Sequence, residues 1–172
     1  VHRLDRATSG CIVLSLKRSV LRTLNTEMRE GRVEKKYLAV VGGKWPHKEV
    51  HITSSLKKNH LRSGERHVIE TPDGKQSITK FKRLADNQRV CLLECTLLTG
   101  RTHQIRVQVS NEGYPVIGDK KYGHDELNNF YRKRGIKRML LHAKEINFPE
   151  IDIFCSTEEP HIFKEILSNN GK

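Results

Sequence analysis

The 172-residue sequence is poor in apolar residues and has no long apolar run. Hydrophobic residues make up 35% of the chain, below the average of globular proteins, while charged residues make up 30%. No stretch approaches the roughly 20 consecutive apolar residues that a membrane-spanning helix needs. We therefore expect a domain with a small core and a highly charged surface, and no membrane as a partner.

Cysteines are few and are not spaced as metal ligands. The four cysteines include no CxxC pair, and none has a histidine at the spacing of a zinc site. Cys91 and Cys95 lie in an apolar stretch, so in a strand both would point to the same face. We expect buried free thiols, which suit a reducing cytoplasm, and we expect neither a metal nor another cofactor.

Acidic residues are scarce relative to basic ones. The chain has 32 lysines and arginines against 20 acidic residues, which gives a net charge of +12. Such an excess favours a polyanionic partner such as RNA or DNA. Residues 57–89 and 132–138 are the most basic stretches, and we expect both to contact phosphates.

Apolar periodicity predicts one mixed α+β domain over residues 1–172. Strands are predicted over residues 11–16, 37–41, 89–98, 139–143, 146–148 and 151–155. Helices are predicted over residues 19–30, 102–113 and 161–167, with Ser19 and Thr102 as N-caps of the first two. Residues 72–74 (Pro-Asp-Gly) predict the turn of a long hairpin.

The sequence of residues 2–10, HRLDRATSG, places Asp5 between Arg3 and Arg6. One interpretation is a carboxylate that caps a turn, because Asp and Ser-Gly are common in turns. The other is an anionic nucleophile, since nearby positive charge keeps a carboxylate ionised, as a nucleophile requires. The spacing alone does not decide between them.

Together with later segments, this motif resembles the signature of the RluA-type pseudouridine synthases. Residues 36–41 (KYLAVV) are similar to the second motif of that family, and residues 97–107 (LLTGRTHQIRV) to the third. Residues 140–143 (LLHA) fit a fourth. The motifs follow one another in the family's order, and the similarity runs over nearly the whole chain.

Within the family, the sequence is most similar to the RluC branch, which acts on 23S ribosomal RNA. Residues 17–22 and 61–66 carry this finer resemblance. The family fold implies a single catalytic core with a bent, mostly antiparallel mixed sheet, flanking helices and an RNA-binding cleft. Family members carry further strands, and often a small S4-type RNA-binding domain, before this point. We therefore expect an N-terminally truncated chain.

The resemblance implies an isomerase that converts specific uridines of 23S ribosomal RNA to pseudouridine. Asp5 would be the nucleophile, attacking either ribose C1′ or uracil C6. Tyr37 would stack on the flipped uracil, and Arg106 would pair with Asp5. Considered without the family, Tyr37 also fits packing at a strand start, and Arg106 a surface position on a helix.

Further residues are expected to bind the RNA. Arg3 would fill the space that the flipped uracil leaves, with help from His2. Four candidates lie at the predicted helix start, where free backbone N–H groups favour phosphate: Arg101, Thr102, His103 and Gln104. His103 also fits a structural role in the turn.

Two other functions stay open. A non-catalytic RNA-binding protein would explain the charge, but it gives no reason for Asp5, Tyr37 and Arg106 together. A related synthase that acts on transfer RNA would share the core motifs. For either enzyme we expect a monomer.

Overall fold

The computed structural model describes residues 1–60 and 66–168, which form one eight-stranded sheet with helices packed on it. The strands are β1 (Ser9–Gly10), β2 (Glu34–Gly42), β3 (Glu49–His60), β4 (Arg66–Glu70), β5 (Lys75–Asp86), β6 (Val90–Leu97), β7 (Leu141–Phe148) and β8 (Ile153–Ser156). The helices are α1 (Arg18–Arg29), α2 (Gln104–Asn111), α3 (Asp125–Lys133), α4 (His161–Ser168) and the 3₁₀ turn η1 (Pro149–Ile151).

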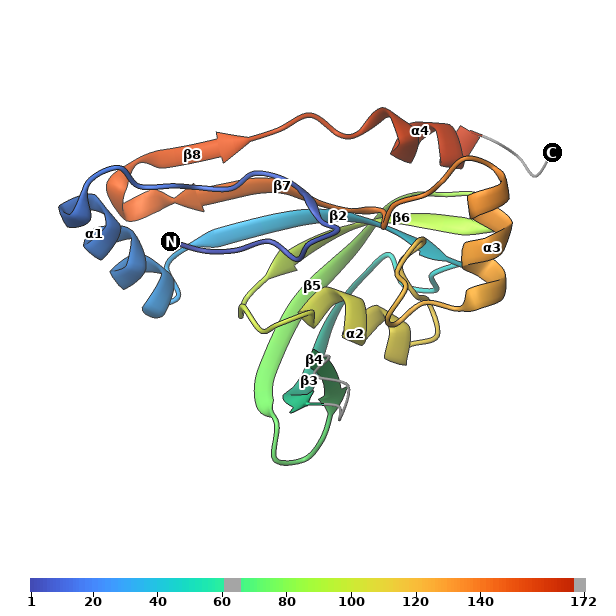
Figure 1. Cartoon of the computed structure of the whole chain (residues 1–172), viewed down its shortest axis with the longest axis horizontal. Coiled ribbons are helices and arrows are strands. Elements are labelled where there is room, and N and C mark those ends of the chain that lie inside the picture. Colours follow the sequence, from blue (N-terminus) through green and yellow to red (C-terminus); the bar gives the residue numbers. More distant parts are fainter. Residues whose placement is uncertain (61–65, 169–172) are drawn as a thin grey trace.

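The strand order is β1-β7-β2-β6-β5-β3-β4, and β8 also pairs with β7. Strand β1 runs parallel to β7, and the other pairs are antiparallel. The predicted α+β class with a mostly antiparallel sheet is confirmed. The sheet is bent, with β5 and β3 turning away from the direction of β2 and β7, and α2 lies in the angle (Figure 1).

Strand β2 is buried on both faces because its apolar run is continuous. Ala39 and Val41 pack in the cluster that contains the apolar side chains of α2. Leu38 and Val40 point to the opposite face and pack with α3 and α4. Helix α2 therefore covers one face at the centre of the sheet, and α3 and α4 cover the other. This packing fixes the positions of the motif residues on β2 and α2.

The predicted strand over residues 11–16 is wrong. Ser9 and Gly10 pair with β7, and the Cys11 N–H donates to the Ala143 carbonyl, but the chain then leaves the sheet. Leu14 and Leu16 are exposed. Within the described residues no strand pairs with this segment, and β structure needs a partner for its backbone groups.

The predicted hairpin around residues 72–74 is also wrong. The chain does turn there, but β4 and β5, the strands that the turn joins, both pair with β3. Local turn chemistry predicted the tight turn, in which the Gly74 N–H donates to the Thr71 carbonyl. It did not predict that β4 and β5 run in the same direction, which follows because both are antiparallel to β3. Residues 61–65, part of the segment similar to the RluC branch, lie outside the described residues.

The helices α1, α2 and α4 occur where they were predicted, but the caps differ. Helix α1 begins at Arg18 and not after Ser19, and α2 begins at Gln104, after His103 and not after Thr102. Helix α3 was not predicted.

In the described part of the chain, no helix combines the length and apolar character needed to cross a membrane. Cys91 and Cys95 are buried free thiols, as predicted.

Candidate active site

Asp5 lies in a tight turn that is fixed to strand β7. The Thr8 N–H donates to the Asp5 carbonyl at 2.9 Å, and the next two residues form β1 against β7. Gly10 has a φ of +114°, and a Cβ atom there would lie 2.1 Å from the Ala143 carbonyl oxygen. Only glycine fits this approach. The Ser-Gly end of the first motif therefore determines where Asp5 sits.

The second motif reaches the same place from the other side of β7. Tyr37 pairs with Ala143, just after a bulge between Lys36 and Tyr37. Strand β7 thus separates Gly10 on one side from Tyr37 on the other. A β-bulge redirects the side chains of its strand. The first two motifs, far apart in the sequence, meet across one strand.

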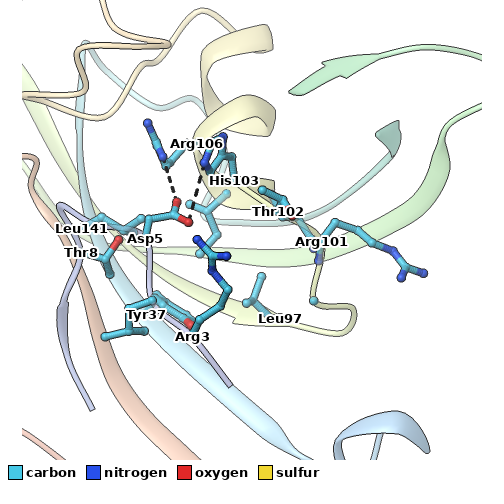
Figure 2. A pocket seen from close by; sticks show the side chains of 14 residues that line it. Arg3, Asp5, Thr8, Tyr37, Leu97, Arg101, Thr102, His103, Arg106 and Leu141 are labelled. Carbon is cyan, nitrogen blue, oxygen red and sulfur yellow. Dashed lines mark hydrogen bonds and ion pairs between the residues drawn. The ribbon is translucent and has the colours of Figure 1, made fainter. Parts of the chain in front are cut away.

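A cavity of about 190 Å³ lies between these motifs and the start of α2 (Figure 2). Its lining comes from residues 3–5, Thr8, Tyr37, residues 97 and 100–106, and Leu141. Leucine side chains and the Tyr37 ring supply apolar walls, and Asp5 supplies a carboxylate. This combination suits a flat, polar ring that needs both stacking and a charged group.

Arg106 of α2 holds two carboxylates at once. Its Nη1 donates to Asp5 Oδ2 at 2.9 Å, although the two residues are 101 positions apart. The Nε and Nη2 atoms donate to the two oxygens of Asp119 at 2.7 and 2.9 Å. The predicted pairing of Asp5 with Arg106 is therefore present, and Asp119 fixes the direction of the guanidinium.

Asp119 is a buried carboxylate that the sequence analysis missed. It is 1% exposed and also accepts the backbone N–H groups of Lys121 and Tyr122. Burial alone would raise its pKa, but the hydrogen bonds and charge of Arg106 hold the pKa below its usual value. An acidic residue in a basic segment between Gly118 and Gly123 was the available signal, similar in kind to that at Asp5.

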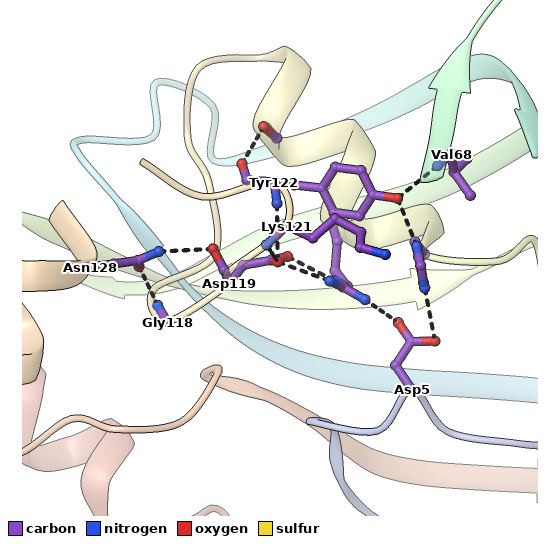
Figure 3. A network of polar contacts seen from close by, with 10 residues as sticks. Asp5, Val68, Gly118, Asp119, Lys121, Tyr122 and Asn128 are labelled. Carbon is purple, nitrogen blue, oxygen red and sulfur yellow. Dashed lines mark hydrogen bonds and ion pairs between the residues drawn. The ribbon is translucent and has the colours of Figure 1, made fainter. Parts of the chain in front are cut away.

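A second contact reaches Asp5 through His103 (Figure 3). Tyr122 Oη accepts the Val68 N–H at 2.9 Å and lies 2.7 Å from His103 Nδ1. We assign the tyrosine proton to this second bond, which leaves the imidazole proton on Nε2, 3.8 Å from Asp5 Oδ1. Burial lowers the pKa of His103 despite the charge of Asp5, which favours the neutral ring.

A family model described as RNA pseudouridylate synthase matches residues 1–111. The chain belongs to this family. The Ribosomal large subunit pseudouridine synthase C of Buchnera aphidicola (strain Bp) is 40% identical over 174 residues, which cover 98% of this chain and 55% of that protein. The protein of the same name from Escherichia coli K12 is 41% identical over 150 residues, covering 86% and 47%. The chain spans about half the length of these curated relatives.

A solved structure supports the same family. Human RNA Pseudouridylate Synthase Domain Containing 1 superposes with a TM-score of 0.79 at 29% identity, covering 92% of this chain and 68% of that one. The predicted membership in the RluA-type enzymes, within the RluC branch, is confirmed. The roles of single residues in this member of the family stay predictions.

Gln104 is buried within the pseudouridine synthase fold, and an RNA contact by its side chain stays a prediction. Gln104 is 3% exposed, and its amide bonds to Thr79 and to the Ile78 carbonyl. Its carbonyl accepts from Thr99 and from the Arg101 N–H. The residues of the first turn of α2 are buried, although most of them also line the cavity that contains Asp5. Gln104 ties the loop before α2 to β5.

The other predicted RNA contacts differ in their surroundings. Arg3, Arg101 and Thr102 line the cavity, and both arginines are exposed. His2 does not line it. Its Nε2 accepts the Val13 N–H at 2.9 Å, which holds the N-terminal segment together. An RNA contact by His2 stays a prediction.

Replacing Asp119 by Asn is expected to lower the free energy of unfolding by about 2–3 kcal/mol, because Arg106 loses a charged partner. Urea unfolding measures this. Because the pKa of Asp119 is lowered in the folded protein, its stabilisation is present above the unfolded pKa of about 3.9 and is lost as the pH falls through the folded pKa. The difference in stability between the two proteins should therefore begin to shrink as the pH falls below about 4 and should vanish below the folded pKa of Asp119. Equal stability at pH 7 would contradict this role.

Proposed function

We propose that residues 1–172 form the catalytic domain of an isomerase that converts uridine to pseudouridine in large-subunit ribosomal RNA. The observation that supports this best is the Asp5 carboxylate, held by Arg106 beside Tyr37 in one cavity. The names of the curated relatives support the choice of RNA. Ribosome assembly would place the enzyme in the cytoplasm, and the predicted monomer is part of the proposal.

In the proposed reaction, the target uridine flips out of the RNA and its uracil enters the cavity. Asp5 attacks ribose C1′ or uracil C6, and the bond between C1′ and N1 breaks. The base turns and C5 bonds to C1′, and the bond to Asp5 breaks, which regenerates the carboxylate. C5 then loses its proton, and N1 gains one. Arg106 presents the carboxylate, and its own positive charge is secure because hydrogen bonds with Asp119 and Asp5 raise its pKa against the effect of burial. Arg3 occupies the space that the uridine left.

Tyr37 has the position for stacking on the uracil. Burial, with the nearby charge of Asp5, raises the pKa of its hydroxyl to about 12. The hydroxyl is therefore protonated at neutral pH. To assist in removing the C5 proton, the Tyr37 hydroxyl must donate its own proton to another group as it accepts the proton from C5.

Replacing Tyr37 by Phe is expected to leave RNA binding nearly unchanged and to slow product formation by about 10²–10⁴-fold, the range of a general acid–base contribution. Single-turnover rates at saturating RNA measure the effect. As a control, Tyr37→Ala also removes the ring and should weaken binding by about 1–3 kcal/mol. Unchanged single-turnover rates in Tyr37→Phe would exclude a proton role.

Tritium release tests the proposed function directly. Pseudouridine formation removes the hydrogen at uracil C5, so RNA with 5-tritiated uridine must release tritium when the protein acts on it. A non-catalytic RNA-binding protein releases none. Large-subunit ribosomal RNA is compared with transfer RNA, each from cells that lack the enzyme. Release from transfer RNA alone would assign the activity to the related class of synthases.

A further inference from the structure

A second, larger cavity adjoins the one that contains Asp5. Its volume is about 470 Å³, and the two cavities share Gly100, Arg101 and Thr102 in their walls. The shared residues form the loop between β6 and α2. A polymer that placed one unit in the first cavity would pass over this loop and reach the second with the next unit.

The floor of the second cavity is apolar. Leu56 of β3 and Val68 of β4 line it and pack in a cluster with Val107 and Tyr122. The volume falls within the range of about 300–1,000 Å³ that is usual for small-ligand sites, while the first cavity is smaller. The first cavity therefore suits a base alone, and the second suits a larger unit such as a whole nucleotide.

The rim of the second cavity is cationic. One acidic residue, Asp73, lines it. Four basic residues also line it: Lys57, Lys58, Lys75 and Arg101. Lys57 pairs with Asp73, which offsets both charges. Among residues 1–60 and 66–168, no carboxylate forms an ion pair with the other three cations. These charges are available to an anion.

Arg101 is directed toward the second cavity. Its Nε donates to the Gln76 carbonyl at 3.0 Å, which fixes the side chain over the strand β5. Figure 2 shows the Arg101 side chain extending away from Asp5. An arginine held this way presents its terminal nitrogens to a phosphate at little further cost in conformational entropy.

We propose that the second cavity binds the nucleotide next to the target uridine, with its phosphate on Lys58, Lys75 and Arg101. The inference rests on the proposed function, because uracil must occupy the first cavity. The neighbouring phosphate then fixes the register of the RNA relative to Asp5. Two residues of the basic stretch at residues 57–89, Lys58 and Lys75, would thus bind this one phosphate.

The first test replaces Lys75 by Gln and measures binding of a short single-stranded RNA with one uridine among cytidines. Loss of one phosphate contact should weaken binding about tenfold. It should also reduce the slope of log K against log salt concentration by about 0.7. Lys164→Gln is the matched control, since Lys164 is exposed on α4, far from β3 and β4 (Figure 1), and it should change neither value. Equal effects of the two substitutions would overturn the proposal.

The second test identifies the phosphate. Each phosphate near the uridine is replaced in turn by a neutral methylphosphonate. At one position beside the uridine, the methylphosphonate should cost the original protein more affinity than it costs Lys75→Gln, because only the original protein has the Lys75 contact to lose. Moving the uridine by one nucleotide should move this position with it. Additive losses at every position would overturn the proposal.

Tritium release from large-subunit ribosomal RNA, measured in parallel, separates the two proposals. If tritium is released but the affinity losses are additive, the proposed phosphate site in the second cavity is wrong and the proposed isomerase activity is supported. If the affinity losses are non-additive but no tritium is released, the phosphate contact is supported and the proposed isomerase activity is wrong.

Discussion

Asp5→Asn is expected to lower pseudouridine formation by at least about 10⁴-fold, the scale on which loss of a nucleophile slows other enzymes. Asparagine has nearly the same shape, and the turn depends on the Asp5 carbonyl, which accepts from Thr8 and is not changed. Arg106 also keeps both hydrogen bonds to Asp119. The substitution therefore removes the charge and the nucleophile while the fold is preserved.

RNA binding by Asp5→Asn should survive, because the cationic residues that contact phosphate are unchanged. The measurements are single-turnover pseudouridine formation and RNA affinity at fixed salt. Asp152→Asn serves as the control, since this residue is exposed and does not line the cavity, and it should retain full activity. An active Asp5→Asn protein would exclude Asp5 as the nucleophile.

Arg106→Lys is expected to slow the reaction by about 10²–10³-fold although the positive charge is kept. The guanidinium uses three nitrogens for two carboxylates, with both oxygens of Asp119 on one side and Asp5 on the other. A lysine ammonium is a compact charge and cannot reproduce this planar arrangement. Asp5 would lose its fixed direction, and a misplacement of about 1 Å at a reacting group costs on the order of 10²-fold in rate.

The Arg106→Lys result is separated from a loss of folding by two measurements. Urea unfolding shows whether enough folded protein remains at the assay temperature, and RNA affinity shows whether the cavity still admits its substrate. Arg29→Lys, an exposed substitution on α1, should leave the rate unchanged. If Arg106→Lys reacted at the normal rate, the fixed orientation of Asp5 would not contribute to catalysis.

The residues that form the cavity were mostly predictable from the sequence, because the motifs mark them by type and order. Asp5, Tyr37 and Arg106 lie together around one cavity. Asp119 was not predicted, since its only local signal is an acidic residue between two glycines. Its importance comes from Arg106, which lies 13 positions earlier and reaches it only through the fold.

Gln104 has hydrogen-bond partners that the sequence did not indicate. Its place at a predicted helix start indicated an RNA contact. Its amide NH2 group donates to Ile78 and Thr79 of β5, and its carbonyl accepts from Thr99 in the loop before α2. The strand predicted over residues 11–16 failed because an apolar run forms a strand only where a neighbouring strand is present to pair with it. Local pattern does not report which segment packs against which.

The sequence by itself determined the net charge, the apolar runs that become the central strands, the glycine at position 10, and the identity of the chemical groups. These depend on residue type and on near neighbours along the chain. The tertiary structure alone decided that Arg106 joins Asp5 to Asp119, that Tyr122 connects β4 to His103, and that a second cationic cavity adjoins the first. Such contacts form between segments many residues apart, and their energies depend on distances that only the folded chain sets.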